Sequence, residues 1–199
     1  MPVNDNAVYL TFDDGPHPQI TPWVLDELKK YNAKASFFCV GKNVVKHEDI
    51  YHRIVEEGHA LGNHTHNHLN GWRVSDREYM HDIKEAAKHI ATNLFRPPYG
   101  RIRAKQFDKL NMAMQLRSKL IMWDVLSADF DTAISPEQCL KNVMSNTKSG
   151  SIIVFHDSQK AYTNLVYTLP RVMQLLNEKK CLFKKIEFHD NEVFQPHRL

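Results

Sequence analysis

The 199-residue sequence has no long apolar run, no recognisable leader segment and no paired-cysteine motif. A membrane-spanning helix needs about 18 or more consecutive apolar residues, whereas the longest candidate, residues 151–155, has only the length of a strand. Residues 1–6 are polar and lack the charged and then apolar pattern of a leader. Three widely separated cysteines, Cys39, Cys139 and Cys181, give no disulfide framework because their number is odd. We therefore expect no membrane span, three reduced thiols and a cytoplasmic location, or an extracytoplasmic one if the natural N-terminus is longer.

A strong charge of one sign is also missing, since 26 Lys and Arg residues face 23 Asp and Glu residues for a net charge of +3. The basic residues are scattered, and two short clusters, within residues 101–105 and 179–185, are typical of solvated faces. No repeat or low-complexity linker divides the chain. We expect one domain over residues 1–199, a monomer, and no nucleic-acid partner.

Short apolar runs of β type alternate with helical patterns along the chain. Strands are expected at residues 7–12, 35–40, 59–63, 119–124, 151–155 and 181–186. Helices are expected at residues 21–32, at 49–57 with Gly58 closing it, at 76–94 after a Ser75 cap, from Ser135-Pro136-Glu137, and in a last helix ending near Leu176. This alternation predicts parallel strands with helices packed outside, and six or seven such units favour a closed or nearly closed barrel over an open sheet.

Polar residues follow several of these strands. Asp13-Asp14 comes after the first strand, His64 after the third, Asp129 after a later one and His156 after the sixth. Because the site of a (β/α) barrel is built where strands end and loops begin, these side chains are expected to converge on one rim.

The first of these segments, residues 11–16, reads Thr-Phe-Asp-Asp-Gly-Pro. Two adjacent carboxylates repel each other, and Gly-Pro turns the chain directly after them. The pair is compatible with a simple Asp-rich turn. It is equally compatible with one carboxylate binding a metal while the other stays free as a base.

Histidine is unusually frequent, at 12 residues, and three of the twelve lie within residues 64–68. His64 and His68 are four residues apart, which would place both on one face of a helical turn, where they can bind one ion; His66 would point elsewhere. Surface histidines are the alternative. Two histidines and one carboxylate leave a coordination position open for water, as in catalytic zinc sites.

Two further segments complete the set. Arg96 precedes two prolines that stiffen the loop. The loop is compatible with a plain surface connection. It is also compatible with a site in which Arg96 reaches a carboxylate and the Tyr99 N–H donates to an oxyanion. His156 follows an apolar strand, a position that on its own also suits a buried core residue.

Taken together, these segments resemble the polysaccharide deacetylases, carbohydrate esterase family 4. The five ordered motifs of that family read TFDDGP, H-S/T-x-x-H, RxPY, DxxDW and LxH, and they correspond here to residues 11–16, 64–68, 96–99, 126–130 and 154–156. The first three match in full. Leu126, Phe130 and Val154 depart from the family pattern. Phe130 keeps an aromatic wall and Val154 an apolar pocket for the acetyl methyl, whereas Leu126 removes a polar group, a change that concerns substrate contacts more than chemistry.

The resemblance implies a distorted, incomplete (β/α) barrel of about seven parallel strands. It also implies a hydrolase that removes acetyl groups from N-acetylated or, alternatively, O-acetylated sugars by means of a divalent metal, zinc or alternatively cobalt. The implied roles are Asp13 as base, Asp14, His64 and His68 as metal ligands, Arg96 orienting Asp13, Tyr99 binding the oxyanion through its amide, Asp129 tuning His156, His156 as acid, and Pro97, Pro98, Phe130 and Val154 in the substrate pocket.

Two other readings remain open. Two histidines and a carboxylate also describe the facial triad of non-haem iron oxygenases, although that class does not use Asp13, Arg96 or His156. A non-catalytic glycan-binding relative is the other, although no ligand or base is lost. A GxSxG nucleophile motif is absent from the sequence, which disfavours a serine acyl-enzyme. Chitin oligomers, peptidoglycan and acetylated xylan are all substrates of the family, and the sequence favours none of them.

Overall fold

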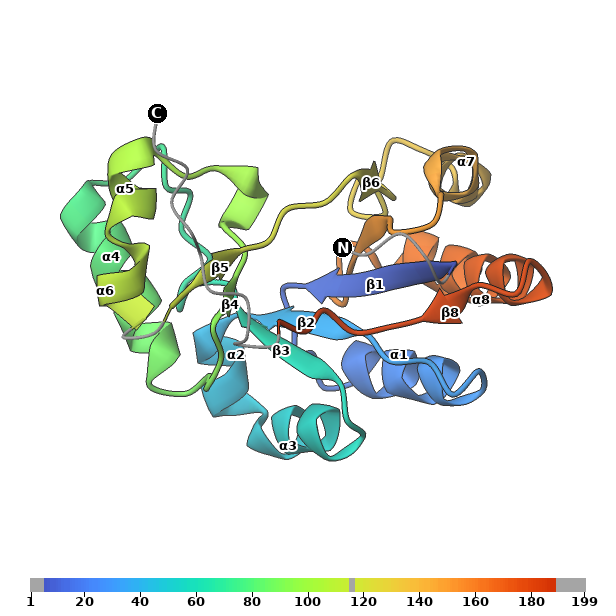
Figure 1. Ribbon diagram of the computed structural model, residues 1–199, viewed down its shortest axis with the longest axis horizontal. Helices are drawn as coiled ribbons and strands as arrows, with labels where there is room; N and C mark the ends of the chain where they lie inside the picture. The colour runs from blue at the N-terminus through green and yellow to red at the C-terminus, as the bar shows by residue number, and fades with distance from the viewer. Residues whose placement is uncertain (1–5, 115–116, 189–199) are drawn as a thin grey trace.

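The computed structural model describes residues 6–114 and 117–188, and in these residues a single curled sheet is surrounded by helices (Figure 1). The strands are β1 (Ala7–Asp13), β2 (Ser36–Cys39), β3 (Ala60–Asn63), β4 (Leu94–Phe95), β5 (Lys119–Leu120), β6 (Val125–Leu126), β7 (Ile152–His156) and β8 (Leu182–Phe183). The helices are α1 (Ile20–Lys29), α2 (Gly41–Lys46), α3 (Glu48–Glu56), α4 (Asp76–Ala87), the 3-10 turn η1 (Pro98–Gly100), α5 (Ala104–Asp108), α6 (Leu110–Met114), α7 (Pro136–Asn146) and α8 (Tyr162–Glu178). The expected single domain over residues 1–199 includes both termini, which lie outside the described residues.

The sheet has the order β5-β4-β3-β2-β1-β7-β6, and β8 pairs with the first residues of β1. The pairs along this order are parallel. The expected (β/α) architecture with about seven parallel strands is confirmed.

The curl of the sheet follows from the connection between its two edge strands. β5 and β6 lie at opposite edges, yet only residues 121–124 separate them, and Figure 1 shows the chain running directly from one to the other. That connection spans at most about 18 Å, whereas the edges of a flat seven-stranded sheet lie about 29 Å apart. The sheet must therefore curve until its edges approach each other, which gives an incomplete barrel.

The prediction of one strand over residues 119–124 is wrong for the same reason. The segment begins as β5 against β4, leaves the sheet, and joins the opposite edge as β6 against β7. A continuous apolar pattern does not reveal where hydrogen bonding passes from one neighbour to another.

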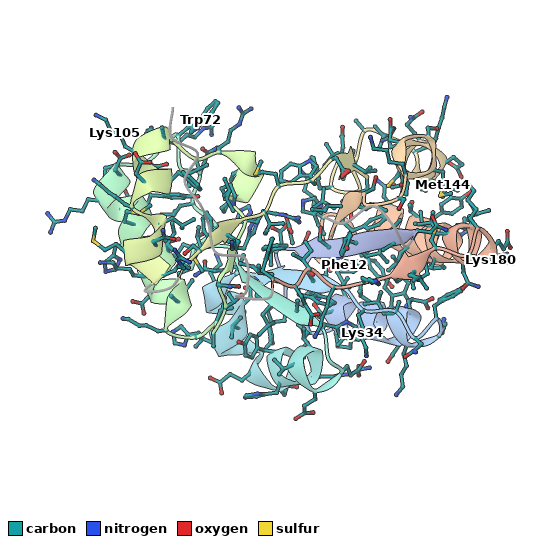
Figure 2. All side chains as sticks on the ribbon, in the orientation of Figure 1. Phe12, Lys34, Trp72, Lys105, Met144 and Lys180 are labelled. Carbon is teal, nitrogen blue, oxygen red and sulfur yellow. The ribbon has the colours of Figure 1, made fainter. Side chains whose placement is uncertain are left out.

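The core lies between the central strands and the helices that cover them. Phe12 of β1, labelled near the centre of Figure 2, is fully buried. Its ring stacks on Phe37 of β2 at 5.1 Å and on Phe155 of β7 at 6.0 Å between centroids. Each buried ring contributes about 2–3 kcal/mol. This packing fixes the register of three neighbouring strands, and that register places Asp13 directly opposite His156.

Helix boundaries agree with the sequence where a capping residue defines them. The Ser75 hydroxyl accepts a hydrogen bond from the Glu78 N–H at 3.2 Å, and Ser135 accepts one from the Gln138 N–H at 3.2 Å. Gly58 follows α3 with a φ of +79°, the left-handed conformation that commonly ends a helix. These three predictions are confirmed.

The predicted helix over residues 76–94 is too long. α4 ends at Ala87, and Leu94–Phe95 form β4 instead. The Thr92 hydroxyl donates to the Leu61 carbonyl of β3 at 2.6 Å, which draws the chain onto the sheet before β4 pairs with β3 and β5. The short helices α2, α5 and α6 were also not expected from the sequence.

None of the helices in the described part of the chain is long and apolar enough to cross a membrane. Cys39 and Cys139 are buried free thiols, and Cys181 is a partly exposed one.

Candidate active site

The polar residues that follow the strands meet at one cavity. It has a volume of about 460 Å³ and is lined by Asp13, Asp14, His64, His68, Tyr99, Trp123, Leu126, Phe130, His156 and Lys160. The cavity therefore lies at the carboxyl ends of β1, β3 and β7, where a parallel barrel places its functional groups. Of the side chains expected to converge there, Asp13, Asp14, His64 and His156 line the cavity, whereas Asp129 is buried against His156.

Three ligand-type side chains form a cluster inside this cavity. One ligand atom from each of Asp14, His64 and His68 lies within 4.8 Å of the others. Asp14 Oδ1 lies 3.1 Å from His68 Nε2 and 3.8 Å from His64 Nε2. Asp14 Oδ1 is buried, yet no donor reaches it with the geometry of a hydrogen bond. A buried carboxylate oxygen facing two imidazole nitrogens without a hydrogen bond fits the donor set of a divalent cation such as zinc.

The protonation states of the cluster suit ligation. Burial, together with the neighbouring His68, lowers the pKa of His64 to about 4, so its ring is neutral near pH 7. The His64 Nδ1 lies 2.7 Å from the Arg96 carbonyl, which orients the ring and leaves Nε2 facing the cluster. Burial alone would raise the pKa of Asp14, but the nearby imidazoles of His68, His156 and His64 hold that pKa well below its usual range. Asp14 thus offers an anion to the cluster, and His64 offers a neutral nitrogen lone pair.

The way in which His64 and His68 meet differs from the expected helical turn. Residues 64–68 are irregular, with positive φ at Thr65 (63°) and His68 (58°). The loop is held by the buried Asp82 of α4. Its Oδ2 accepts hydrogen bonds from the backbone N–H groups of His66 and Asn67 at 3.0 and 2.9 Å. The His66 ring lies beside His89, with 6.0 Å between centroids, and does not line the cavity. The sequence contained no signal for Asp82, because α4 is separate from the histidine motif.

Asp13 lies beside this cluster and is held by Arg96. The fully buried Arg96 guanidinium donates to Asp13 Oδ1 and to the Thr11 hydroxyl, each at 2.7 Å. It also donates to the carbonyls of Ile121 and Met122 at 3.1 and 3.2 Å. Arg96 therefore holds one oxygen of Asp13 and also binds two carbonyls of the segment that connects the two sheet edges. The other oxygen, Oδ2, lies 4.0 Å from His64 Nε2.

His156 is paired with Asp129 on another side of the cavity. The His156 ring Nδ1 lies 2.7 Å from Asp129 Oδ1, and the His156 backbone N–H donates to Asp129 Oδ2, also at 2.7 Å. Burial lowers the pKa of His156, but the charge and hydrogen bond of Asp129 outweigh that effect and raise it to about 9. The ring is therefore an imidazolium at neutral pH. The edge of Phe130 packs against it at 5.0 Å between centroids.

Of the four pocket residues expected from the sequence, Phe130 lines the cavity. Tyr99, expected to act through its backbone amide, lines it as well, with a side chain that is 61% exposed and packs 4.8 Å from His68 between ring centroids. Pro97, Pro98 and Val154 are buried and do not line the cavity, so the structure does not place them against a substrate.

Two lining residues, Trp123 and Lys160, were not anticipated, because neither belongs to a motif. Leu126 lines the cavity as well; the sequence marked this position only as a departure. Trp123 reaches the site because its segment crosses between the sheet edges.

A curled parallel sheet with charged and ligand-type side chains at the carboxyl ends of its strands defines an enzyme of the incomplete (β/α)-barrel class. Comparison with known proteins identifies it further: the chain belongs to the polysaccharide deacetylase family, whose model matches residues 1–116. The resemblance inferred from the five motifs is thereby confirmed.

Two curated relatives illustrate the similarity. A peptidoglycan-N-acetylglucosamine deacetylase of Bacillus cereus is 35% identical over 189 residues, which cover 92% of this chain and 67% of the relative. A chitooligosaccharide deacetylase of Azorhizobium caulinodans is 34% identical over 161 residues, which cover 77% of this chain and 75% of the relative.

Solved structures agree with the fold. The peptidoglycan N-acetylglucosamine deacetylase Bc1960, in complex with 4-naphthalen-1-yl-N-oxidanyl-benzamide, superposes with a TM-score of 0.84 at 34% identity, over 93% of this chain and 88% of that one. The family 4 carbohydrate esterase of Streptomyces lividans, in complex with acetate, gives a TM-score of 0.80 at 25% identity, over 94% and 95% of the two chains. The incomplete barrel is thus the fold of this family.

Proposed function

We propose that the protein is a metal-dependent deacetylase that hydrolyses the acetamide of N-acetylglucosamine units in a glycan. One observation carries this proposal: the Asp14–His64–His68 cluster lies in the same cavity as the Arg96-held Asp13 and the Asp129-paired His156. The deacetylases of N-acetylated glycans among the relatives support the choice of substrate class.

Asp14, His64 and His68 would hold the ion. Two imidazoles and one carboxylate suit zinc or cobalt and leave a position open, the pattern of catalytic rather than structural sites. When bound, the ion supplies Lewis acidity, which polarises an acetyl carbonyl and lowers the pKa of water. An amide carbonyl is a poor electrophile, so it needs this assistance more than an ester does.

Asp13 acts as the base. Arg96 occupies Oδ1 and holds the carboxylate in one orientation, which leaves Oδ2 on the side of His64 and the ligand cluster. A positioned carboxylate of this kind accepts the proton of the attacking water and contributes roughly 10²–10⁴-fold to the rate. Asp13 is thereby distinct from its neighbour Asp14, whose carboxylate faces the two histidines.

His156 acts as the acid. Its pKa of about 9 keeps it protonated at neutral pH, and Asp129 holds Nδ1, so that Nε2 carries the proton available to the cavity. The nitrogen of the sugar cannot leave as an anion, and it departs once this proton is transferred to it. The Tyr99 N–H is the donor we assign to the developing oxyanion, and the walls formed by Trp123, Leu126 and Phe130 suit an acetyl methyl group.

Acetate release tests the proposal. The chain is incubated with chitooligosaccharides, peptidoglycan and acetylated xylan, before and after metal removal and after zinc is added back. Acetate from an N-acetylglucosamine-containing glycan, lost with the metal and restored by zinc, is the expected result. Turnover that is unchanged after exhaustive metal removal contradicts the metal dependence, and acetate from none of the three glycans contradicts the deacetylase.

A further inference from the structure

The two adjacent aspartates at the end of β1 both face His64 because the backbone turns between them. In an extended strand, neighbouring side chains project to opposite faces. Asp14 instead has a φ of +83°, in the left-handed region that residues other than glycine seldom adopt. With this turn, the carboxylates of Asp13 and Asp14 both approach His64, at 4.0 and 3.8 Å. The position of the Asp14 carboxylate thus depends on an unfavourable backbone conformation.

Contacts from outside the cavity hold that conformation. Asn43 of α2 donates from its side-chain amide to the Asp14 carbonyl at 2.8 Å. On the other side, Asp157 Oδ1 accepts the Gly15 N–H at 3.0 Å, and the Asp157 backbone N–H donates to the Asp13 carbonyl at 3.1 Å. The peptide groups on both sides of Asp14 are therefore fixed, and neither Asn43 nor Asp157 lines the cavity.

Asp157 is itself locked in place. It is buried, and its second oxygen accepts the Thr21 hydroxyl at 2.5 Å. Gly15 packs so closely on this carboxylate that a Cβ there would collide with it. Because both oxygens of this buried side chain accept hydrogen bonds, Asp157 is fixed in one orientation. It holds the turn and does not reach the cavity.

We propose that Asn43 and Asp157 are positioning residues that hold Asp14 as a metal ligand. The inference rests on the proposed function, because it assigns Asp14 to the ion. Partners that orient a ligand typically alter metal affinity by about 10–100-fold. Removing the Asn43 amide leaves all three ligands in the chain but releases the carbonyl of Asp14, so the bound geometry becomes one conformation among several.

Asn43→Ala is the principal test. Asn43 is only partly buried, and alanine is the best helix former, so α2 is retained. Asn146→Ala is the matched control, since its amide also donates to a backbone carbonyl at 2.8 Å but lies on α7, away from the cluster. Zinc affinity is measured by chelator competition, the visible spectrum is recorded for the cobalt form, and thermal unfolding of the apo form monitors folding.

For Asn43→Ala we expect zinc affinity to fall about 10-fold, an altered cobalt spectrum, and turnover that recovers in excess zinc. Asn146→Ala should match the wild type in all three. Zinc affinity of Asn43→Ala equal to that of Asn146→Ala overturns the positioning role, whatever its turnover. A wild-type chain that binds no zinc overturns the proposed function first, and the two failures are thereby distinguished.

A second pair of variants examines Asp157. Asparagine can still accept the Gly15 N–H and can donate to the Thr21 oxygen, whereas alanine makes neither contact. Asp157→Asn should keep zinc affinity close to that of the wild type, and Asp157→Ala should lose it by about the same factor as Asn43→Ala, or more. Equal zinc affinity in folded Asp157→Ala and wild type removes Asp157 from the assignment.

Discussion

Replacing Asp129 by asparagine should move the alkaline limit of activity by more than two pH units. The pKa of His156 rises from an ordinary value of 6.5 to about 9 because of the Asp129 carboxylate, against the effect of burial. That difference corresponds to about 3 kcal/mol in favour of the imidazolium. Without that charge, burial opposes only the weaker effects of the Asp13 and Asp14 carboxylates, and the pKa of His156 should return to near its ordinary value of 6.5.

The sign of the effect follows from the proposed role of His156 as an acid. The protonated form is active, so activity is present below its pKa and lost as pH rises through it. At pH 8 the protonated fraction falls from about 90% to about 3%, a loss of about 30-fold from protonation alone. Near pH 5.5 both proteins are mostly protonated, and the difference should be much smaller.

The assay is acetate release from a chitooligosaccharide, with kcat/KM recorded between pH 5 and 10, because that ratio reports the free enzyme. Asp131→Asn serves as the control, since its carboxylate accepts the N–H of Ala133 and is not paired with His156 in the described part of the chain. A uniform loss at all pH values, with the alkaline limit unmoved, would refute the reasoning and assign Asp129 a purely structural part.

The remaining predictions concern the ligands and their neighbours. Chelation should abolish acetate release, and zinc or cobalt should restore it. Asp14→Ala should lower metal content together with activity, whereas Asp13→Asn should keep its metal and lose roughly 10²-fold or more in turnover; metal analysis of both variants checks this, and metal lost only from Asp13→Asn would reverse the two roles. His156→Ala should reduce turnover on amides by roughly 10²–10⁴-fold but affect activated esters less, since their leaving group needs no proton; equal losses would argue against an acid. Arg96→Met leaves the buried Asp13 without its partner and should lower the free energy of unfolding by about 3–5 kcal/mol in a urea titration; an unchanged value would contradict the buried pairing.

Much of the fold could be predicted because the local signals agree with the tertiary environment. β1 is buried along its whole length, so a run of apolar residues broken only by Thr11 marks it as far as Phe12. Ser75 and Ser135 mark helix starts because their hydroxyls satisfy free N–H groups of their own first turns. In these places a residue acts on its near neighbours in the chain, so the residue types were sufficient to predict the element.

Predictions failed where pairing between distant segments decides the structure. β4 and β5 have two residues each. Such short strands form because β4 pairs with β3 on one side and with β5 on the other. Nothing in the apolar pattern of residues 119–124 indicates that it passes from one edge of the sheet to the other.

The residues of the site were marked by motifs, but their arrangement was not. His64 and His68 were expected to meet through helical spacing, and they meet instead in an irregular loop tied to Asp82. The approach of both Asp13 and Asp14 to His64 depends on a backbone turn held by Asn43 and Asp157, which the chain contributes from other segments.

The sequence by itself determined the chemistry of this protein: which side chains can bind a metal, carry a proton or pair with a carboxylate, and at which strand ends they stand. Only the tertiary structure decided their geometry. It includes the curl that brings Trp123 to the cavity and the close contact with Asp129 that keeps His156 protonated at neutral pH. The physical reason is that side-chain chemistry belongs to each residue, whereas orientation and electrostatic environment come from atoms far away in the chain, and folding alone brings these together.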